Sequence, residues 1–332
     1  MASYIIKRLM QVIPTLLGIT LITFLIIQLA PGNPATLKLQ MAGQGQMGES
    51  AMAKQIIEQT KKLYGLDKPL IVQYLLWVKR VFTLDFGNSF KDHRPVLDKV
   101  VERLPVTIQL NVISIFLVYL ISIPFGVLSA THADSLTDRA LTLFFFFLYS
   151  LPNFWVAVLL IMFFGGGDFL DIFPVYGISS IGADSWPFFH WLIDRLWHLV
   201  LPVTCLTYGG LAYLSRLTRA EMLEVIREDY IRTARAKGLS ERTVIFKHAL
   251  RNALLPIVTL LAFLLPAMFG GSVIIESIFS VPGMGQLGFE AVLSRDYPVI
   301  MAITTISALL TLIGLLVSDI LYALFDPRIK LE

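Results

Sequence analysis

Six long stretches without a charged residue constrain this chain more than any other feature. Each contains 20 to 28 residues and no Asp, Glu, Lys or Arg. A helix needs about 20 mostly apolar residues to cross a bilayer, and in lipid a helix satisfies its own backbone polar groups. We therefore predict an all-α polytopic membrane protein with six transmembrane helices. The stretches are Leu9–Ala30, Leu104–Ala130, Ala140–Gly167, Leu196–Ser215, Asn252–Ile275 and Tyr297–Ser318.

The composition agrees with a membrane protein and argues against several other classes. Of the 332 residues, 56% are hydrophobic and 15% are charged, whereas a soluble domain carries about 25% charged residues. The net charge of +3 indicates no nucleic-acid partner. Cys205 is the single cysteine and the five histidines form no HExxH pattern, so we predict no disulfide, no metal site and no catalytic residue.

The first stretch has two interpretations. Lys7 and Arg8 precede it, as basic residues precede the apolar part of a signal peptide. Its 22 residues, and the proline that directly follows Ala30, favour a retained membrane anchor instead.

The distribution of basic residues predicts which side of the membrane each connecting segment faces. Segment 216–251 holds nine Lys and Arg residues, whereas segments 168–195 and 276–296 hold one each. The positive-inside rule therefore makes segment 216–251 and both termini cytoplasmic. Segment 31–103 carries eleven basic residues, but its 73 residues exceed the length over which the rule counts. The predicted organisation is a cytoplasmic N-terminus with the first helix (1–30), an extracytoplasmic lobe (31–103), a five-helix membrane core containing segment 216–251 (104–326) and a cytoplasmic tail (327–332).

The outer lobe is predicted to be partly helical. Glu49–Tyr64 has a helical pattern that stops at Gly65, and Leu70–Leu84 has a second with Gly87 just beyond it. The alternative is a solvated linker, but the apolar positions of these patterns need to be covered.

Segment 216–251 has the features of a protein-docking element. Helix formers fill its first half, Gly238 can adopt the left-handed conformation that ends a helix, and Ser240 is a good N-cap for a second helix. Ala234 and Ala236 are small, so another surface can approach closely. The alternative is a basic loop that orients the protein and contacts anionic lipid headgroups, but 36 residues with five acidic side chains exceed that requirement.

The run Tyr230-Ile-Arg-Thr-Ala-Arg-Ala-Lys-Gly238 resembles the cytoplasmic coupling motif of ABC importer permeases. Over nearly its whole length the chain is similar to the B-type permease of the dipeptide/oligopeptide/nickel family. It departs from the general coupling motif at Arg232-Thr233-Ala234, in place of Glu-Ala-Ala, and at Leu250-Arg251, in place of Leu-Pro, as is usual for the peptide subfamily. Further matching runs are Tyr4-Ile-Ile-Lys-Arg-Leu, Pro14-Thr, Gly18-Ile-Thr, Ala30-Pro-Gly-Asn-Pro34, Tyr64-Gly-Leu-Asp-Lys-Pro69, Leu104-Pro-Val-Thr107, Ser277-Ile-Phe-Ser-Val-Pro-Gly-Met-Gly285, Arg295-Asp-Tyr-Pro298 and Asp326-Pro-Arg328.

The resemblance implies a bundle like that of type I ABC importers, in a bacterial or archaeal plasma membrane. It implies a second homologous permease, two cytoplasmic ATPase subunits that bind the ATP, and an extracytoplasmic substrate-binding protein, besides membrane lipid. The chain itself has no GxxxxGK[ST] phosphate loop and needs no cofactor of its own. The residues expected to contact an ATPase are Tyr230, Arg232, Ala234, Arg235, Ala236, Gly238, Leu239 and Ser240.

The cargo expected from the resemblance is a dipeptide or oligopeptide, with a nickel chelate as the alternative. Asn111, Asn153 and Tyr208 are polar residues within the uncharged stretches and are candidates for lining a pathway, although polar groups there also join helices. A secondary transporter or channel acting alone is a second class, but the spans lack internal repeats and ionisable groups. An intramembrane hydrolase is a third, for which Gly270-Gly-Ser272 and His198 lack an orienting carboxylate.

Overall fold

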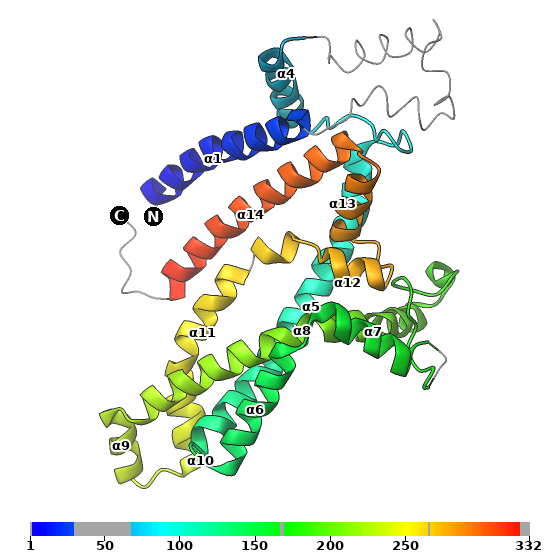
Figure 1. Cartoon of the computed structure of the whole chain (residues 1–332). Coiled ribbons are helices and arrows are strands. Elements are labelled where there is room, and N and C mark those ends of the chain that lie inside the picture. The colour runs from blue at the N-terminus through cyan, green and yellow to red at the C-terminus, as the bar shows by residue number, and fades with distance from the viewer. Residues whose placement is uncertain (1, 30–67, 167–168, 265, 326–332) are drawn as a thin grey trace, which may run out of the picture. The chain divides into compact units, whose positions relative to one another are not determined.

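The computed structural model describes residues 2–29, 68–166, 169–264 and 266–325, which are mainly helical (Figure 1). Within these ranges no β-strand is formed. The elements are α1 (Ala2–Leu29), α4 (Leu70–Phe82), α5 (Val96–Thr131), α6 (Leu136–Ser150), α7 (Asn153–Phe164), the 3-10 turn η1 (Ala183–Ser185), α8 (Phe188–Ile226), α9 (Asp229–Ala236), α10 (Glu241–Thr243), the π-helix η2 (Val244–Ala249), α11 (Leu250–Leu264), the 3-10 turn η3 (Pro266–Phe269), α12 (Val273–Ile278), α13 (Met284–Leu293) and α14 (Tyr297–Phe325).

Within the described ranges, three helices are long and apolar enough to cross a membrane, and they correspond to the first, second and sixth uncharged stretches. The qualifying segments are Arg8–Ile26, Val96–Thr131 and Tyr297–Ile320, and α6 with α7 makes a fourth if the bent pair counts as one span. The fourth stretch lies inside the continuous helix α8. An all-α fold with several membrane-length helices is therefore confirmed for the described residues, while the count of six and the side of the termini stay predictions.

The third and fifth stretches are not the single helices that their lengths predict. α6 and α7 meet at an angle of 96°, because Pro152 has no N–H and disfavours a helical conformation in the residue before it. Leu151 accordingly has extended backbone, with φ −81° and ψ 127°. In the fifth stretch, η3 and Gly270-Gly271 separate α11 from α12. Pro124, Pro202 and Pro256, by contrast, lie inside continuous helices.

The chain forms two compact units. Of the described residues, the first unit comprises those in the ranges 104–286 and 311–325. Its main core lies where α5, α7, α8 and α12 pack together, around Leu110, Cys205 and Ile275. α5 and α8 also touch closely at Gly126, where an added Cβ would lie 2.5 Å from the Cβ of Thr218.

The second unit comprises, of the described residues, 2–29, 68–103 and 287–310. The helix predicted at 70–84 is present as α4, and its Tyr74 and Trp77 pack against Phe24 of α1. Other apolar residues of α4 are not covered within the described residues, since Ile71 and Leu75 are 74% and 59% exposed. The predicted helix at 49–64 lies outside the described residues. Asp296, from the Arg295–Pro298 run, is buried and accepts hydrogen bonds from the Ser89 hydroxyl and from the Phe90 backbone N–H at 2.9 Å.

Candidate functional site

The helix, turn and helix predicted in segment 216–251 are present. α8 continues past the fourth stretch to Ile226, and α9 begins at Asp229. Gly238 follows α9 with a φ of +79°, a left-handed conformation that costs little only in glycine. Its backbone N–H donates to the Arg235 carbonyl at 2.9 Å and closes the turn. The predicted helix stop at Gly238 is therefore confirmed.

Ser240 begins the second arm in the manner of an N-cap, but its side chain does not cap. Its backbone is extended, with φ −60° and ψ 142°, while its hydroxyl hydrogen-bonds to the Thr243 hydroxyl at 2.9 Å. An ion pair joins the two arms: Arg235 Nε and Nη2 donate to the Glu241 carboxylate at 3.2 and 2.7 Å. The two side chains are 39% and 57% exposed, so this pair orients the turn more than it stabilises the protein.

The second arm begins with the short α10 and continues as the π-helix η2, a form that the predicted second helix did not specify. In η2 the backbone hydrogen bonds span five residues instead of four. Val244 and Ala249, which are five positions apart, are both fully buried, whereas Phe246 and Lys247 between them are exposed. The wider turn of the π-helix therefore places both Val244 and Ala249 in the core. Local helix propensity does not predict this arrangement.

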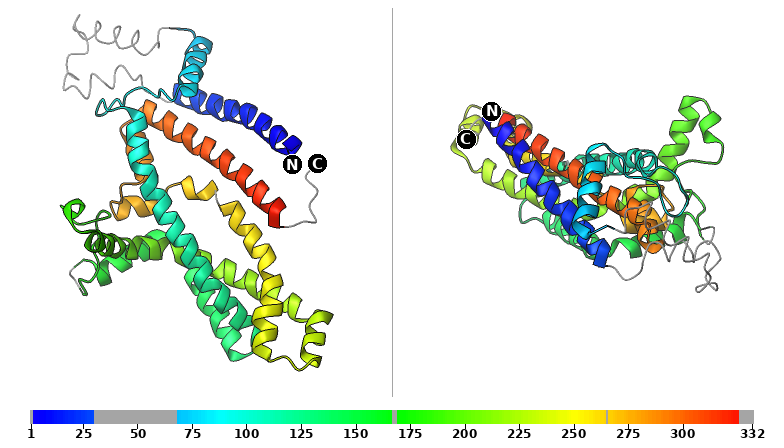
Figure 2. Two further views of the ribbon diagram at one scale, coloured as in Figure 1. Left: turned by 180° about the vertical axis from the view of Figure 1, so that it is seen from behind. Right: turned by 90° about the horizontal axis from the view of Figure 1, so that it is seen from above.

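One face of segment 216–251 packs against the ends of α5, α8 and α11. Ile231 and Ala234 of α9 join Val244 and Met222 in one buried cluster. Ala234 is only 7% exposed, so its small side chain lets α9 approach its own chain, which corrects the prediction that it leaves room for another protein. The cluster includes residues of α5 and α11, and Figures 1 and 2 show these helices meeting α8 beside α9.

The other predicted coupling residues are exposed. We call them the coupling surface: Tyr230, Arg232, Arg235, Ala236, Gly238, Leu239 and Ser240. Phe246 is a further exposed aromatic residue of the segment. The sequence placed it at the end of the stretch 234–246 expected to meet the ATPase, but did not single it out as a coupling residue, because its orientation depends on the π-helix. Aromatic and arginine side chains are enriched where proteins bind one another, so this exposed set suits a protein partner.

An ion pair between a buried carboxylate and a partly exposed arginine lies at the base of the segment. Asp138, in the first turn of α6, is 4% exposed and accepts from Arg219 Nε and Nη2 of α8 at 2.8 and 2.6 Å. The Ser129 hydroxyl of α5 and the Asp134 backbone N–H also donate to it. Each carboxylate oxygen of Asp138 therefore accepts two hydrogen bonds, one of them from the Arg219 guanidinium. Sequence reasoning counted Arg219 only as a basic residue, because its partner lies 81 positions away.

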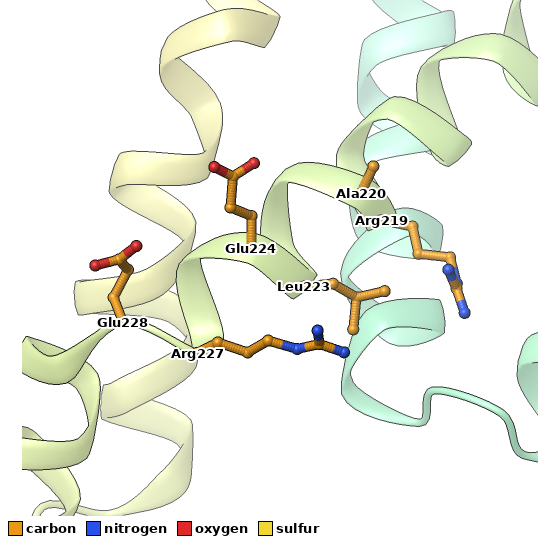
Figure 3. Close-up of a pocket in the computed structure, with 6 residues that line it drawn as sticks. All are labelled: Arg219, Ala220, Leu223, Glu224, Arg227 and Glu228. Carbon is orange, nitrogen blue, oxygen red and sulfur yellow. The ribbon is translucent and has the colours of Figure 1, made fainter.

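An open pocket of about 530 Å³ runs along the last turns of α8, next to this pair (Figure 3). Two arginines and two glutamates line it with two apolar residues, so its charge is balanced and selects neither an anion nor a cation. No group of three or more His, Cys, Asp or Glu that could hold a metal ion lies among the described residues. The lining residues are Arg219, Ala220, Leu223, Glu224, Arg227 and Glu228.

Glu276, at the start of the segment 276–296, is a second buried carboxylate that sequence reasoning missed. It is 1% exposed. Its Oε1 accepts from the Thr107 hydroxyl at 3.1 Å and from the Ser272 backbone N–H at 3.2 Å, and its Oε2 accepts from the Gln286 backbone N–H at 2.9 Å. The sequence does carry a signal for Glu276, because this carboxylate lies between a long apolar run and a glycine-rich loop.

The loop around Glu276 closes tightly because it contains glycines. A Cβ added at Gly283 would lie 2.5 Å from Glu276 Oε2. The Thr107 hydroxyl, besides donating to Glu276, accepts from the Met284 backbone N–H at 2.8 Å. The runs 104–107 and 277–285, which resemble family motifs separately, are therefore parts of one hydrogen-bonded structure.

Two of the three candidate pathway residues bind backbone carbonyls at helix breaks. Asn111 Nδ2 donates to two carbonyls between α11 and α12, at 3.0 and 3.1 Å. The hydroxyl of buried Tyr208 donates to the Leu151 carbonyl, between α6 and α7, at 2.8 Å. Asn153 is exposed as the first residue of α7. Asn111 and Tyr208 thus satisfy carbonyls that have lost helical partners, as the membrane interior requires.

Comparisons with known proteins cover the whole of this chain. Residues 122–331 match the family "Binding-protein-dependent transport system inner membrane component", and residues 1–111 match the N-terminal model of such membrane components. The oligopeptide transport system permease protein AppB of Bacillus subtilis is 44% identical over 331 residues, 99% of this chain and 100% of that protein. The inner membrane ABC transporter permease protein YejB of Escherichia coli is 38% identical over 362 residues, covering 100% of both chains. The dipeptide transport system permease protein DppB of Bacillus subtilis is 37% identical over 333 residues, 100% of this chain and 99% of that protein.

Proposed function

Because this chain belongs to the family of binding-protein-dependent transport system inner membrane components, we propose that it is the permease subunit of an ATP-driven importer of dipeptides and oligopeptides. It forms half of the translocation path and is coupled to a separate ATPase. The names of the relatives support the cargo, since two of them are an oligopeptide and a dipeptide permease protein. A nickel chelate is the second candidate cargo, and a transporter acting alone is a weaker alternative.

The observation that carries the coupling role is the two-sided construction of segment 216–251. Its coupling surface is exposed, while Ile231, Ala234 and Val244 beneath it pack with the ends of α5, α8 and α11. A partner that binds the exposed side therefore pushes on several membrane helices at once. ATP binding in two partner ATPases supplies the push and biases the bundle between inward and outward access.

The proposed topology has six spans, with both termini and segment 216–251 in the cytoplasm. The excess of Lys and Arg in that segment supports it. α6 and α7 form one broken span, and α11 with α12 another, as is common in transporters. A second permease completes the path, and segments 31–103, 168–195 and 276–296 receive the substrate-binding protein.

The docking proposal is tested by adding a side chain at Gly238. A Cβ there meets no atom of the chain within 4 Å, and asparagine tolerates a positive φ better than most residues. Gly238→Asn therefore keeps the turn and places bulk on the coupling surface. We expect the ATPase subunits to co-purify in at least about tenfold lower yield, a loss of about 1.4 kcal/mol in binding.

Gly182 provides a matched control for ATPase binding. It has a φ of +82° and the same open space, but lies in segment 168–195 on the other proposed side. Gly182→Asn should leave the yield of co-purified ATPase unchanged. Equal yields from the two variants and the unmodified protein would contradict the docking proposal. Competition for uptake between labelled dipeptides, pentapeptides and nickel then distinguishes the cargo classes.

A further inference from the structure

We propose that Asp138 and Arg219 are positioning residues that make α6 move together with α8 during transport. The inference rests on the proposed function, because it concerns how displacement of the coupling surface reaches the bent α6–α7 pair. It assigns a coupling role to a pair that lies outside the coupling surface itself.

The buried carboxylate of Asp138 joins three helices. Asp138 begins α6, Arg219 belongs to α8 and Ser129 belongs to α5, and the last two both donate to the Asp138 carboxylate. With the Asp134 N–H the carboxylate accepts four hydrogen bonds, two of them from a planar guanidinium. Such a bidentate pair fixes the mutual orientation of its partners as well as their distance.

A hydrogen bond also joins α6 to α8 at the other end of α6. The Tyr208 hydroxyl of α8 donates to the Leu151 carbonyl directly after α6. Between the two ties, Phe145 of α6 packs with Leu211 of α8 in a buried cluster. Tyr208 and Arg219 are about 16 Å apart along α8, at about 1.5 Å per residue. Two ties at this separation prevent α6 from pivoting on α8, which one tie alone would allow.

Helix α8 connects the ion pair directly to the coupling surface. It is continuous to Ile226, and Met222 in its last turns is buried against Ile231 of α9. A displacement of α9 therefore moves the end of α8 that carries Arg219. The ion pair transfers this displacement to α6, and the Tyr208 tie transfers it to the break at Leu151, where α7 departs at 96°.

A purely stabilising role does not need an ion pair in this place. Buried ion pairs are often replaced by apolar residues without loss of stability, whereas an apolar contact would let α6 slide along α8. The geometry therefore points to orientation as the property that the pair supplies.

The test compares ATP hydrolysis with uptake in the complete transporter, reconstituted in liposomes with its partner subunits and supplied with radiolabelled trialanine. Arg219→Gln removes the charge and the fork, and Arg219→Lys keeps the charge without the fork. Arg139→Gln is the matched control, since Arg139 lies beside Asp138 but is exposed. For Arg219→Gln we expect the ATP hydrolysed per peptide to rise about fivefold or more, the lower end of typical coupling between sites. Arg219→Lys should give a smaller rise and Arg139→Gln none.

An unchanged ratio of ATP to peptide in Arg219→Gln would overturn the inference, including the case in which hydrolysis and uptake fall in the same proportion. If Arg219→Gln yields no assembled transporter, the same criterion applies to Arg219→Lys, where an unchanged ratio is equally decisive. Absence of ATPase subunits from the unmodified preparation would instead overturn the proposed function. The two failures are therefore distinguishable.

Discussion

Replacing Glu276 with glutamine tests whether this carboxylate holds the loop between α12 and α13 in place. The substitution keeps the size of the side chain but exchanges one oxygen for an NH₂ group, which donates instead of accepting. All three partners described above donate to Glu276, at 3.1, 3.2 and 2.9 Å. Whichever oxygen is replaced, an NH₂ group then faces a backbone N–H in a site that is 1% exposed.

The expected loss follows from the hydrogen bonds that glutamine cannot accept. A buried donor left unsatisfied costs about 1–3 kcal/mol, and a hydrogen bond to a charged group contributes about 1.5–3 kcal/mol. Glutamine keeps one accepting oxygen, so we expect the free energy of unfolding to fall by about 2–4 kcal/mol. At about 2–4 °C per kcal/mol for a unit of this size, the melting midpoint should fall by about 4–16 °C.

The assay is thermal unfolding of the purified transporter in detergent, followed by the loss of monodisperse protein after heating. Glu290→Gln is the control, because Glu290 pairs with Lys91 at 3.4 Å while the two side chains are 42% and 52% exposed. Exposed pairs contribute about 0–1 kcal/mol, so its midpoint should stay near that of the unmodified protein. A Glu276→Gln midpoint equal to that of Glu290→Gln would refute the argument that Glu276 holds this loop.

Three further outcomes are expected. Phe246→Ser should lower the yield of co-purified ATPase with little change in the melting midpoint, because the Phe246 side chain is exposed. A clearly lowered melting midpoint would show that Phe246 packs inside the protein. Asp138→Asn should lower the free energy of unfolding by about 1–3 kcal/mol, because each carboxylate oxygen of Asp138 accepts two hydrogen bonds and an NH₂ group in place of either oxygen would face donors. A melting midpoint like that of the unmodified protein would show that these hydrogen bonds do not hold α6. Gly126→Val should lower the free energy of unfolding by about 1–3 kcal/mol. Even a Cβ at this position would lie 2.5 Å from the Cβ of Thr218 and 2.7 Å from the Ser215 carbonyl oxygen. A melting midpoint equal to that of the unmodified protein would show that α5 and α8 can separate there.

Local sequence signals predicted the elements whose causes are local. Gly238 was recognisable as a helix stop because a left-handed residue strongly favours glycine, whatever surrounds it. The helix predicted at 70–84 was recognisable from its apolar spacing, and it is present as α4 at 70–82. The helix breaks were harder to predict, because Pro152 ends a helix while Pro124, Pro202 and Pro256 do not. Neighbouring helices decide whether the groups freed by a proline find other partners.

The direction in which each side chain of segment 216–251 points was not predictable from spacing. Ala234 was expected to face a partner and is buried against its own chain. Phe246 was not selected and is exposed, because the π-helix rotates the residues between Val244 and Ala249 away from an α-helical pattern. Packing at the ends of α5, α8 and α11 sets this arrangement, and those contacts come from positions far apart in the sequence.

The sequence by itself therefore determined the all-α class, the membrane-length apolar runs and the place of the turn at Gly238. Each of these depends on residues that follow one another along the chain, over at most 28 positions. Only the tertiary structure decided that Asp138 binds Arg219 and that Glu276 binds Thr107, pairs separated by 81 and 169 positions. A charged residue has the same local propensity with or without a partner, so only folding, which brings the two groups together and removes them from solvent, determines such pairs.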